Sequence, residues 1–165
     1  MIDNIKILLK TLFVCLLLIF FSLNFNLAFS KDKYVGKGQL IIDGPDLDYF
    51  FNNYLKTPAG QTPLVFWIAE EDGKSIWSAY WYCPTGSCQG INKNELKKSC
   101  ETQGEKYYKD QGLKKDLECF IFAKKRQIVW DTGSLPDDYK LRTIKISWGI
   151  DELKDKLKQF GFNND

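Results

Sequence analysis

The chain has 165 residues, of which 27% are charged, and a formal net charge of +2 at neutral pH. This balance offers no surplus of positive charge for a polyanion, so no nucleic-acid partner is expected. The sequence contains no histidine. Ser-His-Asp and Cys-His catalysis, histidine-ligated metals and the ordinary neutral-pH proton shuttle are therefore excluded.

The first thirty residues have the layout of a secretory signal peptide. Two lysines lead into an apolar run at residues 11–23, and the small residues Ala28 and Ser30 stand just before Lys31. An uncleaved membrane anchor is the alternative. A spanning helix needs about 20 mainly apolar residues, and residues 7–29 reach that length only by including a lysine and two asparagines. We therefore expect cleavage at Ser30/Lys31, a periplasmic or secreted protein, and membrane contact only through this segment if it is retained.

Residues 31–165 are expected to form a single exported domain, because about 135 residues is an ordinary domain size. Strands are predicted at short runs of β-branched and aromatic residues: Gln39–Ile42, Leu64–Glu70, Ser75–Cys83, Cys119–Ala123, Gln127–Trp130 and Lys140–Trp148. Helices are predicted from Asp46 or Asp48 to about Lys56, from Asn92 through Cys100 to about Thr102, and over Asp151–Phe160, with Gly161 as the C-terminal cap. Asp72-Gly73 indicates a hairpin. The predicted fold class is α+β, a mostly antiparallel sheet of about five to six strands with three helices.

Four cysteines remain after the expected cleavage, since Cys15 lies inside the apolar run and would be lost with it. In an exported chain the remaining four, Cys83, Cys88, Cys100 and Cys119, indicate a disulfide framework. Spacing alone allows three pairings. The turn-rich residues between Cys83 and Cys88 favour a bridge between these two, which leaves Cys100 on a helix to bridge Cys119 at the start of a strand. The spacing is not that of a zinc finger or ribbon, and it lacks the C-x-x-C of a thiol oxidoreductase, although neither role is eliminated.

The middle of the chain resembles a small exported four-cysteine domain seen in uncharacterised alphaproteobacterial proteins. The resemblance covers residues 64–130. It depends on a Tyr-Cys strand end, a helix that carries the third cysteine, and a hairpin of the form C-x-x-[FY]-A followed by R-x-I-V-W, here Cys119–Ala123 and Arg126–Trp130. The usual hairpin glycine is replaced by Lys124-Lys125, and the insert near residues 107–112 is long. The resemblance implies export and a disulfide framework, and it implies no activity.

The middle strands are apolar on both faces, which means either that helices cover both faces or that one aromatic face is a docking surface. Helical cover is the simpler interpretation, because single exposed aromatic residues are ordinary. The expected binding surface, if one face is open, consists of the four tryptophans Trp67, Trp77, Trp81 and Trp148.

Two classes of function remain open. The first is a non-enzymatic exported binding or structural module for an envelope protein or glycan, with no cofactor, no metal and no catalytic residues. The second is a small carboxylate- or tyrosine-dependent hydrolase or lyase of the cell envelope. It would need two carboxylates to converge in one cleft, and the candidates are Asp43, Asp46, Asp48, Glu70, Glu71, Asp137 and Asp138. We favour the first class.

Overall fold

The computed structural model describes residues 32–58, 61–83, 88, 91–133 and 142–162. The expected signal peptide, residues 1–30, lies outside the described residues, as do Asp137 and Asp138. The chain divides into two compact units, residues 1–33 and 34–165, and every helix and strand described below lies in the second. Within the described ranges, no helix is long and apolar enough to cross a membrane.

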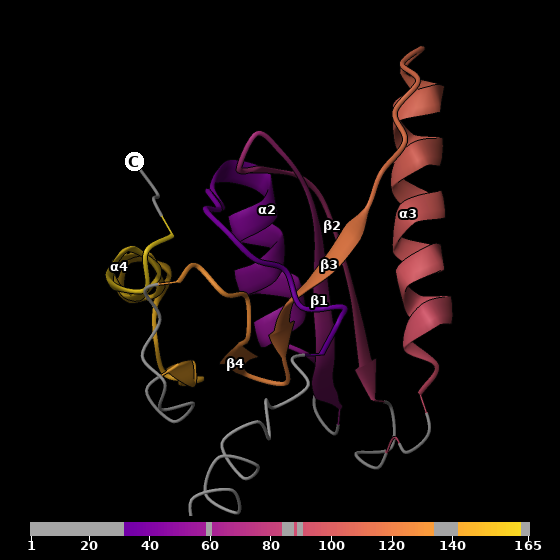
Figure 1. The fold of residues 1–165 in the computed structure, drawn as a ribbon. Helices are drawn as coiled ribbons and strands as arrows, with labels where there is room; N and C mark the ends of the chain where they lie inside the picture. The colour runs from indigo at the N-terminus through magenta and orange to yellow at the C-terminus, as the bar shows by residue number, and fades with distance from the viewer. Residues whose placement is uncertain (1–31, 59–60, 84–87, 89–90, 134–141, 163–165) are drawn as a thin grey trace, which may run out of the picture. The chain divides into compact units, whose positions relative to one another are not determined.

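The described part of the second unit contains one antiparallel sheet of four strands in the order β2-β1-β3-β4 (Figure 1). The strands are β1 (Thr62–Glu71), β2 (Lys74–Cys83), β3 (Cys119–Lys124) and β4 (Gln127–Ile128). The predicted hairpin at Asp72-Gly73 is confirmed, since φ is 53° at Asp72 and 75° at Gly73, the left-handed conformation that a tight two-residue turn requires. Lys125 adopts φ 52° in the β3–β4 turn, where glycine would be less strained.

The expected sheet of five to six strands is too large for the described residues. Ile41 makes a single bridge to Lys74, because the chain enters a helix at Gly44 and leaves no room for a longer pairing. Thr143 makes a single bridge to Gln127. The strand predicted over Lys140–Trp148 begins outside the described residues, and its described part, residues 142–148, forms no strand, because Ile146 is 72% exposed in a turn.

Three helical segments in the described residues cover the sheet from both sides (Figure 1). The first is α2 (Gly44–Tyr49), which continues as the π-helical turn η1 (Phe50–Leu55); α3 (Lys93–Asp110) and α4 (Ile150–Gln159) follow. Side chains of α2, η1 and α4 share one core with Phe66, Ile68 and Phe122. Residues of α3 share the other core with Trp67 and Ile121. Helices on both faces therefore explain why the middle strands lack a polar face.

The helix ends test the capping predictions. Asn92 caps α3 as predicted, because its side chain accepts a hydrogen bond from the Asn94 N–H at 3.1 Å. The C-terminal prediction at α4 is also confirmed. Gly161 has φ 84°, and the Phe162 N–H donates to the Leu157 carbonyl at 2.9 Å in a Schellman motif.

The N-terminal cap of the first helix was predicted wrongly. The cap position of α2 is Asp43, and neither Asp46 nor Asp48 occupies it. The end of the middle helix was also misplaced. Helix α3 continues to Asp110, about two turns beyond the expected end at Thr102.

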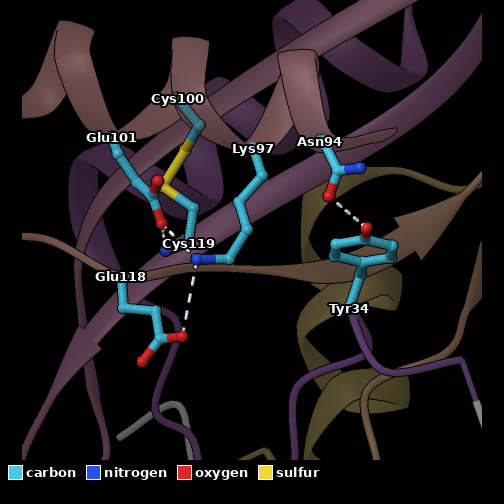
Figure 2. Close-up of polar contacts among 7 residues, drawn as sticks. All are labelled: Tyr34, Asn94, Lys97, Cys100, Glu101, Glu118 and Cys119. Carbon is cyan, nitrogen blue, oxygen red and sulfur yellow. Dashed lines mark hydrogen bonds and ion pairs between the residues drawn. A yellow bond between two sulfur atoms is a disulfide. The ribbon is translucent and has the colours of Figure 1, made fainter. Parts of the chain in front are cut away.

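Both predicted disulfides are present. Cys83 bridges Cys88 and Cys100 bridges Cys119, with Cα–Cα distances of 5.7 and 6.3 Å. Around the second bridge, Glu101 accepts a hydrogen bond from the Cys119 backbone N–H at 3.2 Å, and Lys97 bonds to Glu101 (Figure 2). These polar contacts and the disulfide together hold α3 against the start of β3.

Candidate functional site

An open groove of about 770 Å³ lies at the edge strand β2, where the strand begins. Its lining comes from three elements that are distant in sequence: the start of α2, the first residues of β2 and the last turns of α3. The lining residues are Asp43, Pro45, Asp46, Tyr49, Lys74–Ser78, Tyr107, Tyr108 and Gln111. We call this site the edge groove.

Aromatic rings form one wall of the edge groove. The rings of Trp77 and Tyr107 lie 5.3 Å apart between centroids, and Tyr107 is 49% exposed. The Trp77 indole N–H donates to the Cys100 carbonyl at 3.1 Å, which fixes the plane of the ring. Gly104 allows the close approach of α3, because a Cβ at this position would lie 2.8 Å from Trp77 Cδ1. The aromatic wall is therefore a rigid, partly solvated surface.

Hydroxyl and carboxylate groups form the polar part of the groove. Asp46 accepts hydrogen bonds from the hydroxyls of Ser75 and Ser78, at 2.6 Å each, one on each carboxylate oxygen. A register shift between β1 and β2 next to Ser75 places both serines on the face that Asp46 covers. Lys74 Nζ lies 3.4 Å from Asp43 Oδ2 at the groove margin. Because a carboxylate has about four lone-pair sites, Asp46 keeps acceptor capacity for a ligand.

The four tryptophans named from the sequence do not form one exposed surface. Trp67 is completely buried in the core beneath α3, and Trp148 is buried in the opposite core. Trp77 and Trp81 are half-buried, and of the four only Trp77 lines the edge groove. Helical cover of both sheet faces is the physical reason. Binding by Trp77 or Trp81 stays a prediction.

Two of the candidate carboxylates, Asp43 and Asp46, do share the groove. The other candidate carboxylates among the described residues lie outside the groove. Glu70 accepts a hydrogen bond from the Gly73 N–H at 2.7 Å within the hairpin turn, Glu71 pairs with Lys115 at 2.5 Å, and Asp48 is exposed outside the groove. The sequence alone could not predict that Ser75 and Ser78 both face Asp46, because strand periodicity puts residues three apart on opposite faces. Only the register shift brings them to the same face.

Two of the three tyrosines in the described groove lining, Tyr49 and Tyr108, are poor candidates for a catalytic base. Burial raises the pKa of Tyr49, and nearby Tyr80 raises it further. Burial also raises the pKa of Tyr108, against the opposing charge of Lys115. Both phenols therefore keep their protons at neutral pH, whereas a general base must lose its proton. The Tyr108 hydroxyl donates to the Ile76 carbonyl at 2.7 Å.

No group of three or more Cys, Asp or Glu side chains among the described residues is arranged to hold a metal ion. Comparison of the chain with protein-family models, with curated proteins and with solved structures found no match. The fold and groove define an α+β domain with two disulfides and an aromatic, open edge groove. The resemblance to the alphaproteobacterial four-cysteine domain stays a prediction.

Proposed function

We propose that this protein is an exported, non-enzymatic binding module that holds an uncharged glycan in the edge groove. The observation that carries the proposal is the rigid pair of rings, Trp77 and Tyr107, beside a carboxylate with acceptor capacity at Asp46. The two disulfides support an oxidising compartment, as the proposal of export requires.

The aromatic wall suits the apolar face of a sugar ring. The C–H groups of a pyranose carry partial positive charge and pack against the negative face of an aromatic ring. Tyr107 is half exposed and offers such a face to solvent without any unfolding of the groove. Because the Trp77 indole N–H donates a hydrogen bond to the Cys100 carbonyl, the ring is already fixed. Little conformational entropy is therefore lost when a sugar packs against the wall.

The polar groups suit sugar hydroxyls. Asp46 can accept further hydrogen bonds, and the Gln111 amide can both donate and accept. The ion pair of Asp43 with Lys74 neutralises the groove margin, and Asp46 remains as a negative charge in the described lining, which disfavours an anionic ligand. An envelope protein is the weaker candidate for the partner. It would need a broad apolar surface, and the tryptophans expected to provide one are partly buried in the cores.

A carboxylate-dependent hydrolase is the second candidate, because Asp43 and Asp46 share the groove. Hydrolysis of a glycosidic bond needs one carboxylic acid that donates a proton and one free carboxylate. Here Asp46 accepts two hydrogen bonds from serine hydroxyls and Asp43 lies beside an ammonium group, so in the described groove neither carboxyl group has an acceptor of its own to which it could donate a proton. This arrangement favours binding without cleavage.

Calorimetric titration with maltohexaose, cellohexaose and chitohexaose tests the proposal. At least one sugar should bind, and Tyr107→Ala should weaken its binding by about tenfold, since an aromatic contact contributes about 0.5–1.5 kcal/mol beyond its buried area. Tyr82→Ala is the matched control, because Tyr82 is a 37% exposed aromatic residue of β2 outside the groove. Binding of none of the sugars, or equal binding by both variants, would contradict the proposal. Release of shorter sugars would support the hydrolase instead.

A further inference from the structure

A second pocket, of about 360 Å³, lies near the opposite end of α3, between the start of that helix and the β3–β4 turn. Its described lining is Leu64, Val65, Trp67, Ile91, Lys93, Leu96, Ile121, Lys124, Lys125 and Gln127. None of these residues lines the edge groove. The volume falls in the range of about 300–1,000 Å³ that is typical of small-molecule sites. We call this site the lysine-rimmed pocket.

The inner wall of the pocket is apolar and contains one unsatisfied donor. Trp67 is completely buried, and its indole N–H has no acceptor within hydrogen-bond distance. A buried donor without a partner costs about 1–3 kcal/mol, so the indole N–H of Trp67 is a sensitive reporter group in this wall. The other lining residues apart from the lysines are five aliphatic side chains and one amide: Leu64, Val65, Ile91, Leu96, Ile121 and Gln127.

The buried tryptophan is held in place from outside the pocket. The Tyr34 ring packs edge-on against Trp67, with centroids 6.2 Å apart, and its hydroxyl bonds to Asn94 on α3 (Figure 2). Because Tyr34 joins Trp67 to the helix in this way, the wall is preformed. A preformed site loses less entropy on binding than a site that must be assembled.

The rim of the pocket is cationic. Three of the ten lining residues are lysines, at positions 93, 124 and 125, and no Asp or Glu belongs to the described lining. Lys93 and Lys125 are exposed, and Lys124 is half-buried. An apolar cavity with a positive rim is complementary to a molecule with an apolar body and a negative end.

We infer that the lysine-rimmed pocket binds a single-chain aliphatic carboxylate, such as a medium-chain fatty acid. The acyl chain packs against Leu64, Val65 and Ile121, and the carboxylate lies among the rim lysines. A neutral glycan fits this pocket poorly, because most of the lining apart from the lysines is aliphatic. Apart from the buried Trp67, Gln127 is the one neutral hydrogen-bonding side chain in the described lining. A cationic amphiphile would meet repulsion from the rim.

The test expresses the whole chain, residues 1–165, and uses the protein that the cell produces from it, whether or not the N-terminal segment has been removed. Dodecanoate, dodecanol and dodecylammonium are titrated separately, the two ionic compounds below their micelle-forming concentrations and dodecanol below its solubility limit, and indole N–H resonances are recorded by NMR. The Trp67 resonance is assigned by Trp67→Phe. We expect dodecanoate to bind at least tenfold more tightly than the other two and to shift the Trp67 resonance.

Two variants place the binding in this pocket. Lys125→Glu should weaken dodecanoate binding by roughly fivefold to tenfold, the effect of replacing one attractive exposed charge pair with a repulsive one, whereas Lys154→Glu on α4 is the matched control and should change little. Leu96→Trp should abolish binding by filling the pocket while leaving the rim charges intact. Circular dichroism shows whether each variant is folded.

The alternative outcomes all overturn the inference. Equal binding of dodecanol would show that the rim lysines do not select a negative charge. Tighter binding of dodecylammonium would show that the pocket prefers a positive charge. Dodecanoate binding that survives Leu96→Trp would lie elsewhere on the protein. Failure of dodecanoate to bind would leave the lysine-rimmed pocket without this function, and it would leave the proposal for the edge groove untouched.

Discussion

Removal of the Cys100–Cys119 bridge should destabilise the protein more than removal of the Cys83–Cys88 bridge. The first bridge joins residues 19 apart and the second joins residues 5 apart. In the chain-entropy model these loops correspond to about 3 and about 2 kcal/mol of stabilisation. Cys100 and Cys119 are both completely buried, whereas Cys83 is buried and Cys88 is half-buried. Truncation of the first pair therefore also removes more core contacts, which adds to the difference.

Urea unfolding, followed by circular dichroism, measures both losses. The two double variants are Cys100→Ala with Cys119→Ala, and Cys83→Ala with Cys88→Ala, so neither carries an unpaired thiol. We expect the free energy of unfolding to fall by at least about 1 kcal/mol more in the first variant than in the second, since the loss of core contacts adds to the loop-length difference. An equal loss, or a larger loss in the Cys83/Cys88 variant, would refute the reasoning from loop length and burial.

Two further predictions concern the packing of α3 and the buried tyrosine of η1. Gly104→Ala should lower the free energy of unfolding by about 1 kcal/mol in urea titrations, because the new Cβ would lie 2.3 Å from Leu117 Cδ1 and 2.8 Å from Trp77 Cδ1. Ala in a helix interior ordinarily gains about 1 kcal/mol over Gly, so a more stable variant would refute this packing. Burial raises the pKa of Tyr54 well above its ordinary value, against the opposing charge of Arg126. The unfolded chain therefore loses this proton first, and stability should fall as the pH rises above about 10. Tyr54→Phe should flatten that fall in unfolding experiments across this pH range, and an unchanged slope would contradict the assignment.

Local patterns in the sequence were sufficient to predict one turn, two helix caps and the disulfide pairing. The Asp72-Gly73 turn, the Asn92 cap and the Gly161 cap depend on residues within a few positions of one another, so their chemistry can be read directly from the chain. The Cys83–Cys88 bridge is local in the same way. The pairing of Cys100 with Cys119 then followed by elimination.

The candidate sites depended on contacts that the sequence does not encode locally. Trp67 and Trp77 lie on the same side of the sheet, yet one is completely buried and the other lines a groove, because α3 covers them unequally. The register shift beside Ser75 could not be foreseen from strand periodicity. The prediction of Asp46 as a helix cap is wrong, whereas its prediction as a cleft carboxylate agrees with its place in the groove. Its hydrogen bonds to two serines of β2 could not be foreseen.

The edge groove is the central claim, and the indole N–H resonance of Trp77 tests it most directly. Isotope-labelled protein is titrated with the sugar that binds best, and Trp77→Phe assigns the signal. The Trp77 resonance should shift in proportion to occupancy, while that of Trp81, half-buried on the same strand outside the groove, should stay constant. A sugar that leaves Trp77 unchanged, or that shifts Trp81 alone, would contradict the account.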